Sequence, residues 1–125
     1  FINDTVKSVN WDTQITSCWV VSQRPNEYNP VHFHHQHVSA VTYLKVPKMK
    51  PSRKPAGGKD GCIEFIGVGS RDRRLSSSQF HASPRVGDFY LFGAAQLHTV
   101  YPYRCDDMED AERRSVSFNA TFSQA

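Results

Sequence analysis

The chain has 125 residues, enough to bury one hydrophobic core and too few for two domains. Hydrophobic residues make up 38% of it and charged residues 22%, which is typical of a compact globular protein and excludes a disordered one. The net charge of +3 comes from scattered basic residues with no nucleic-acid-binding motif among them, so we interpret them as solvated loops and not as a nucleic-acid groove.

No apolar run is long enough to span a bilayer, and no signal-peptide pattern opens the chain. Three cysteines, odd in number and without paired spacing, favour the reducing cytoplasm, and the lack of C-x-x-C argues against a zinc knuckle. The chain begins with Phe1 and not with Met, so we expect that its natural N-terminus is missing and that residues 1–125 form a single domain.

Short runs of β-type residues recur between turn signals, and no long segment has a helical period. We therefore predict an all-β fold, and we favour a jelly roll with long surface loops. The predicted strands, in chain order, are 15–22, 31–34, 38–46, 62–68, 88–92, 99–101 and 115–122.

Three segments between the predicted strands have the composition of loops. Residues 47–61 are rich in Pro, Lys and Gly, residues 69–83 contain three arginines and a run of serines, and residues 104–112 contain five acidic residues. Segments of this kind cannot bury much apolar area. We therefore expect 47–61 and 104–112 to border the mouth of a cleft and to be the most mobile parts of the chain.

The most informative motif is a histidine cluster at 32–37, followed about sixty residues later by a single histidine. Side chains at i and i+2 leave the same face of a strand, so His32 and His34 can place two imidazoles on one metal ion. The distant His98 can supply a third ligand and leave other positions open, as a catalytic iron requires. A solvated histidine-rich turn is the simpler alternative.

The remaining histidines have simpler interpretations. His37 shares its strand parity with Ser39, Val41 and Tyr43 and could point into the site, but residues such as His35 and His37 more often cap a tight turn. His81 lies in the polar segment before Pro84, where we expect it to be solvated.

Alternation also places polar residues on one face of the last strand. Arg113, Ser115, Ser117 and Asn119 share that face, whereas Arg114 points the other way. A face this polar is a poor core and a good wall for an active site. Ser39, Val41 and Tyr43 would line the opposite wall, and Val100 would add an apolar surface beside His98.

Three blocks of sequence together carry a resemblance to a known family. They are His32-Phe33-His34 with Val38 to Leu44, Pro84 to Phe92 leading to His98, and Arg113 to Asn119. Each block is weak by itself, but three in order are specific. Over residues 15–122 the chain resembles the small 2-oxoglutarate/Fe(II)-dependent oxygenases common in phages and marine bacteria, which are relatives of the prolyl-hydroxylase-type oxygenases on the double-stranded β-helix fold.

The resemblance implies a metal site and a co-substrate site. His32 and His98 take the family's metal-ligand positions, and His34 stands where most such oxygenases have a carboxylate, although members of this family often carry H-x-H. Fe(II), 2-oxoglutarate and O₂ are then expected. Arg113, whose forked guanidinium matches a carboxylate, would bind 2-oxoglutarate with help from Tyr43, and Ser115 and Asn119 would belong to the same wall.

The activity implied is that of a dioxygenase, most simply a hydroxylase that converts 2-oxoglutarate to succinate and CO₂ while it oxidises a substrate. The primary substrate is not revealed by the sequence, and a peptidyl side chain is only an analogy from distant relatives.

Two alternatives stay open at this point. One is a cupin-type metalloenzyme with three histidines and no 2-oxo acid, which would be expected to carry a glutamate soon after H-x-H. The other is a non-catalytic jelly-roll binding module, which would need neither the three histidines nor Arg113.

Overall fold

The computed structural model describes residues 10–54, 56–67 and 78–125. These residues form strands and no helix, so they contain no helix long and apolar enough to cross a membrane. The strands are β1 (Trp11–Gln23), β2 (Asn29–His32), β3 (Val38–Lys45), β4 (Ile63–Ile66), β5 (Gln79–Ala82), β6 (Phe89–Gly93), β7 (Leu97–Val100) and β8 (Arg113–Gln124).

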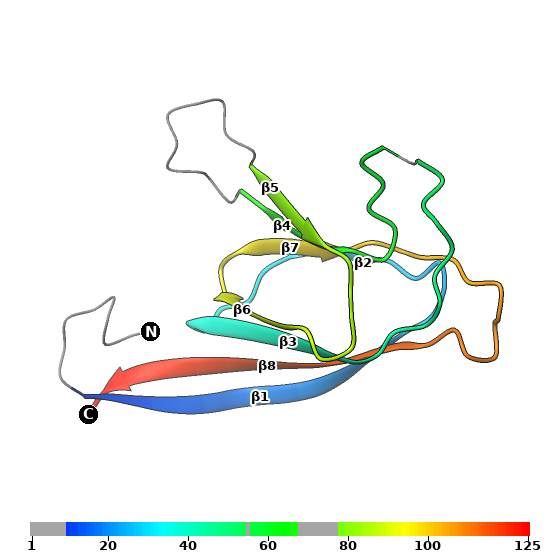
Figure 1. Ribbon diagram of the computed structural model, residues 1–125. Coiled ribbons are helices and arrows are strands. Elements are labelled where there is room, and N and C mark those ends of the chain that lie inside the picture. The colour runs from blue at the N-terminus through cyan, green and yellow to red at the C-terminus, as the bar shows by residue number, and fades with distance from the viewer. Residues whose placement is uncertain (1–9, 55, 68–77) are drawn as a thin grey trace.

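The strands form two four-stranded antiparallel sheets (Figure 1). One has the order β1-β8-β3-β6 and the other the order β2-β7-β4-β5, so consecutive strands lie in different sheets except for β4 and β5, which pair with each other. This arrangement is consistent with a jelly roll, and the predicted all-β class is confirmed. The strands β1 and β2 are edge strands of their respective sheets.

The hydrophobic core lies between the sheets. Val41 on β3 packs with Ile63 and Phe65 on β4, and Tyr90 and Phe92 on β6 cover them from the side. The side chains of Ile63 and Phe65 are 3% and 6% exposed, and alternation along β4 places both on the same face of the strand. The core therefore occupies the side of the sandwich where β6 lies.

The predicted boundaries differ from the observed ones where the sequence has no apolar pattern. β1 begins at Trp11, four residues before the predicted start, and pairs with β8 as far as Gln124. Residues 12–16 of β1 are exposed, so no buried face marks them in the sequence. Conversely, β2 ends at His32, and His34 lies just beyond the strand.

The prediction that residues 69–83 form a loop is wrong for the C-terminal end of this segment. Gln79–Ala82 forms β5 and pairs with β4, with His81 opposite Glu64. This four-residue run is too short and too polar to be recognised without its partner strand, which supplies the hydrogen bonds. His81 is exposed, as expected, but it lies on a strand. Residues 68–77 of that segment lie outside the described residues.

Candidate metal centre and its pocket

A pocket of about 510 Å³ lies between the two sheets. Its walls come from β1, β3, β6 and β8 on one sheet and from β2, β4 and β7 on the other. The exposed lining residues are Ser22, Glu27, Tyr28 and Asn29, so the mouth lies between the end of β1 and the start of β2. This volume is within the range of small-molecule sites.

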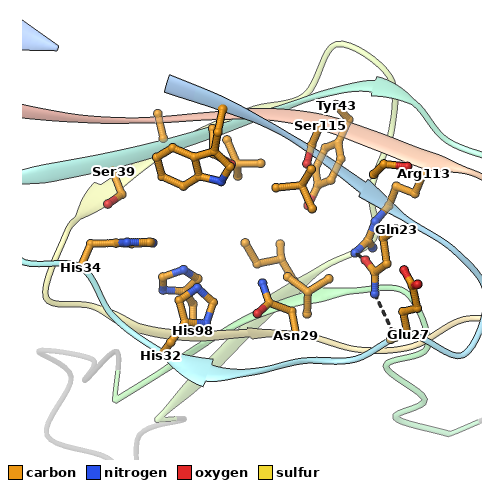
Figure 2. A pocket seen from close by; sticks show the side chains of 18 of the residues that line it. Gln23, Glu27, Asn29, His32, His34, Ser39, Tyr43, His98, Arg113 and Ser115 are labelled. Atoms are coloured by element: carbon orange, nitrogen blue, oxygen red, sulfur yellow. Dashed lines mark hydrogen bonds between the residues drawn. The ribbon is translucent and has the colours of Figure 1, made fainter. Parts of the chain in front are cut away.

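Three histidines meet at one end of this pocket (Figure 2). β2 pairs with β7 so that His32 stands opposite His98, and the chain leaving β2 brings His34 beside them. The candidate ligand atoms of the three residues all lie within 4.8 Å of one another. The ring centroids of His32 and His98 are 4.1 Å apart, and that of His34 is 5.3 and 5.4 Å from theirs.

Backbone carbonyls orient two of these rings. Nδ1 of His98 donates to the carbonyl oxygen of Gln96 at 2.8 Å, and Nδ1 of His32 donates to that of Pro30 at 2.6 Å. Because a carbonyl can only accept, each Nδ1 carries a proton, and in the neutral ring Nε2 then has a free lone pair. Metal-binding histidines are held in this way, with the second nitrogen donating to a fixed acceptor.

The surroundings favour the neutral form of the imidazoles of His98 and His34. Burial lowers the pKa of His98 to about 4, although its bond to Gln96 opposes this effect. Burial, followed by the nearby His32 and His35, lowers the pKa of His34. A neutral imidazole is the form that binds a metal, so this end of the pocket is suited to one without a prior loss of protons.

The donor set fits a divalent transition metal. Three imidazole nitrogens suit iron, copper, nickel or zinc, whereas Mg²⁺ and Ca²⁺ prefer oxygen ligands. Three protein ligands leave coordination positions open toward the pocket. Two aromatic rings flank the cluster: the ring centroid of Phe92 lies 4.9 Å from that of His98, and the ring centroid of Trp19 lies 5.7 Å from that of His34.

At the other end of the pocket lies a buried arginine (Figure 2). Arg113 begins β8 and is 4% exposed. Its Nη1 donates to the carbonyl oxygen of Gly61 and its Nη2 to Oε1 of Gln23. The rings of Tyr43 and Tyr103 lie 6.0 and 5.6 Å from its Cζ.

No carboxylate of the described residues forms an ion pair with Arg113. Burial lowers the pKa of its guanidinium. The groups that oppose this effect are Tyr43, Tyr103 and Cys62, and none of them is a carboxylate. An uncompensated buried cation is costly, so this end of the pocket is suited to an anion.

The alternation predicted for β3 and β8 places most of the expected residues on the pocket wall. Ser39, Val41 and Tyr43 line it from β3, Ser115 and Ser117 from β8, and Val100 from β7. Burial raises the pKa of Tyr43 to about 12, although Arg113 opposes this effect, so its hydroxyl keeps its proton.

Asn119 is not among the lining residues. It is 4% exposed, and its Oδ1 accepts a hydrogen bond of 2.6 Å from the hydroxyl of Ser39. Asn119 therefore touches the site only through Ser39, which it holds in position.

The other two histidines of the cluster lie outside the pocket. His37 is exposed, stacks on Phe122 with centroids 5.8 Å apart, and accepts the backbone N–H of Phe122 through Nδ1 at 2.8 Å. His35 is exposed beside the ring of Phe33. His37 therefore does not point into the site, and its side chain binds the distant strand β8 instead of capping a tight turn.

The expectation that the segments 47–61 and 104–112 border the cleft is wrong. None of their described residues lines the pocket. They pair with each other instead, through a bridge between Met49 and Cys105 and an ion pair between Lys50 and Asp106. The greater mobility expected of them stays a prediction.

The sequence pattern did not identify Gln23, Glu27, Asn29 and Trp19 as site residues. All four line the pocket. Alternation along β1 from Trp19 through Val21 to Gln23 is the signal that could have found Gln23, but the predicted strand ended one residue too early. Glu27 and Asn29 lie near a turn in which Asn26 has a φ of 67°, and no pattern in the sequence assigns them to a site.

Two comparisons bear on this arrangement. A protein-family model described as "Putative 2OG-Fe(II) oxygenase" matches residues 17–119, a range that contains the three histidines and Arg113. No curated protein matches the chain.

Proposed function

The chain belongs to the 2OG-Fe(II) oxygenase family, and from this premise we propose that it is an Fe(II)/2-oxoglutarate-dependent dioxygenase. The reaction proposed is a hydroxylation, in which decarboxylation of 2-oxoglutarate to succinate accompanies oxidation of a C–H bond in a second substrate. The observation that carries the proposal is a pocket with three imidazoles at one end and, at the other, a buried guanidinium that forms no ion pair with any carboxylate of the described residues.

His32, His34 and His98 would hold the iron, each through a ring nitrogen that faces the other two. Bound Fe(II) would supply the activation of O₂ that no amino-acid side chain can provide. The three imidazoles add no negative charge, so an anionic 2-oxo acid would balance the charge of the metal better than a neutral ligand would.

Arg113 would bind the distal carboxylate of 2-oxoglutarate. Its guanidinium is planar, buried and permanently charged. It can therefore orient a bound carboxylate and form strong charge-assisted hydrogen bonds with it. Tyr43 lies beside it with its hydroxyl protonated and can donate to the same carboxylate. Ser115 offers a further hydroxyl on this wall, and Asn119 supports the wall by holding Ser39.

The apolar lining would keep water away from the reacting end. Val41, Ile63 and Val100 contribute this surface between the two polar ends of the pocket. The mouth at Tyr28 and Asn29 is the exposed side, where the second substrate would enter. A cytoplasmic location belongs to the same proposal, because free cysteines such as the three of this chain are typical of that reducing compartment.

The decisive experiment adds Fe(II) and then 2-oxoglutarate to the protein without oxygen. Chelation of the metal by the oxo acid gives a weak visible charge-transfer band, which we expect here. A cupin-type enzyme without a 2-oxo acid, or a binding module, would give no such band.

Variants localise the signal to the proposed site. His98→Ala should abolish the band together with iron binding, whereas His81→Ala, which removes an exposed histidine on β5, should leave both unchanged. Release of succinate after admission of oxygen tests turnover. Iron that binds in the wild type with no band at saturating 2-oxoglutarate would contradict the proposal.

A further inference from the structure

The side chain of Gln23 lies against the guanidinium of Arg113 inside the pocket (Figure 2). Gln23 is the last residue of β1 and is 6% exposed. Its Oε1 accepts from Nη2 of Arg113, and its Nε2 donates to the carbonyl oxygen of Glu27 at 2.7 Å. The backbone is anchored as well, because the hydroxyl of Tyr103 lies 2.6 Å from the carbonyl oxygen of Gln23.

The carboxamide oxygen of Gln23 therefore occupies a position that an incoming carboxylate oxygen would need. The fork of Arg113 has two outer nitrogens, of which Nη1 bonds to Gly61 and Nη2 to Gln23. A neutral amide oxygen forms a weaker bond with a guanidinium than a carboxylate does. The existing contact satisfies the buried cation only in part and can give way to an anion.

We propose that Gln23 is an internal surrogate for the distal carboxylate of the co-substrate, and that its displacement from Arg113 sets the affinity for 2-oxoglutarate. This inference rests on the proposed function, because it assumes that a dicarboxylic oxo acid binds at Arg113. Gln23 is then a positioning residue: it holds the guanidinium in the pocket when the co-substrate is absent and competes with the co-substrate when it is present.

Two substitutions at this position should act in opposite directions. Gln23→Ala removes the competing bond to a charged group, so we expect the Kd for 2-oxoglutarate to fall about tenfold. Gln23→Glu places a permanent carboxylate on Arg113, and repulsion between like charges should raise that Kd at least about 100-fold. Gln14→Glu is the matched control, since it makes the same change at an exposed position of β1.

The affinities are measured from the visible band of the Fe(II)-loaded protein under anaerobic conditions. The shift in melting temperature that 2-oxoglutarate causes provides a second readout that needs no turnover. Pyruvate, which has the oxo acid group but no distal carboxylate, separates this role from a structural one. Because pyruvate has no carboxylate that could bind Arg113, Gln23→Ala should leave the affinity of the protein for pyruvate unchanged.

The outcomes separate this inference from the proposed function. If the wild type binds 2-oxoglutarate and Gln23→Ala binds it no better or less well, Gln23 is a support or a direct ligand, and the inference is overturned. An equal change for pyruvate and 2-oxoglutarate would overturn it too. If neither the wild type nor Gln23→Ala gives a band with iron bound, the proposed function is wrong and the inference fails with it.

Discussion

The inner faces of β8 and β4 are both buried, yet they have opposite chemistry. On β8 the residues that point between the sheets are polar, with Arg113 at 4% and Ser115 at 7% exposure. On β4 they are apolar, with Ile63 at 3% and Phe65 at 6%. A buried apolar wall contributes to stability by itself, whereas a buried polar wall requires partners.

On the outer faces of the same two strands the chemistry is the opposite: apolar residues lie on β8 and a charged residue lies on β4. Val116 and Phe118 on β8 are only half-buried, whereas Glu64 on β4 is 1% exposed beneath Lys59 and Tyr101. The comparison teaches that stability and ligand binding are divided between the two walls of one cavity. The wall of β4 holds the sheets together, and the wall of β8 presents the charge and hydroxyls that a ligand can use.

The charge on the polar wall should determine the affinity for 2-oxoglutarate. Arg113→Ala should raise the Kd for 2-oxoglutarate at least about 30-fold, because an anion would enter a buried site without its cation. Arg113→Lys should give an intermediate Kd, since it keeps the charge and loses the fork. Titration of the charge-transfer band measures both, and iron binding should stay unchanged.

Arg114 provides the matched control for that prediction. It is the next residue on β8, points outward and pairs with Glu112. Arg114→Ala should therefore leave the Kd for 2-oxoglutarate at the wild-type value. An Arg113→Ala protein with wild-type affinity would remove the proposed role of the polar wall.

The apolar wall should respond in stability instead. Phe65→Ala leaves a cavity beside Val41 and Ile63, and the free energy of unfolding should fall by about 3–5 kcal/mol. Urea denaturation measures the loss. Phe80→Ala is the control, because Phe80 stacks on Phe65 from β5 but is 52% exposed, so its removal should cost much less. Equal losses in the two variants would contradict the assignment of Phe65 to the core.

The smallest effect should appear on the outer face of β4. Burial alone would raise the pKa of Glu64, but hydrogen bonds from Lys59 and Tyr101 outweigh it and lower that pKa. Its ionised form therefore stabilises the fold above the pKa of the unfolded chain, and this contribution disappears as the pH falls through the lower pKa of the folded state. Glu64→Gln should cost about 1–3 kcal/mol near neutral pH.

The pH dependence distinguishes this role from simple packing. Stability of the wild type should fall more steeply in acid than that of Glu64→Gln, as followed by urea denaturation at several pH values. The bond to Glu64, followed by burial, raises the pKa of Tyr101 to about 12, so the tyrosine should keep its proton at neutral pH. Glu109→Gln, at an exposed carboxylate, serves as the control. Parallel pH profiles for wild type and Glu64→Gln would show that the charge of Glu64 does not matter.

Local alternation was sufficient to predict much of the candidate site. A period of two along β3 and β8 placed Tyr43 and Ser115 on walls that do line one pocket. The spacing of His32 and His34 brought both rings toward His98, even though His34 lies beyond the strand. These predictions concern residues a few positions apart, whose relative directions follow from the geometry of an extended backbone. They can therefore be made from the sequence alone.

Other features depend on contacts between distant parts of the chain. β5 forms because β4 offers it a hydrogen-bonding edge, and its own four residues carry no pattern. The role of Gln23 depends on Arg113, ninety residues away, and that of Asn119 on Ser39, eighty residues away.

The sequence by itself therefore determined the all-β class, the histidine pair with its distant third member, and the separation of β8 into a polar and an apolar face. Only the tertiary structure decided that the polar face is buried, that Gln23 covers Arg113, and that the mouth lies between the ends of β1 and β2. The physical reason is that alternation defines two faces of a strand, while the packing of one sheet on the other determines which face becomes the inside.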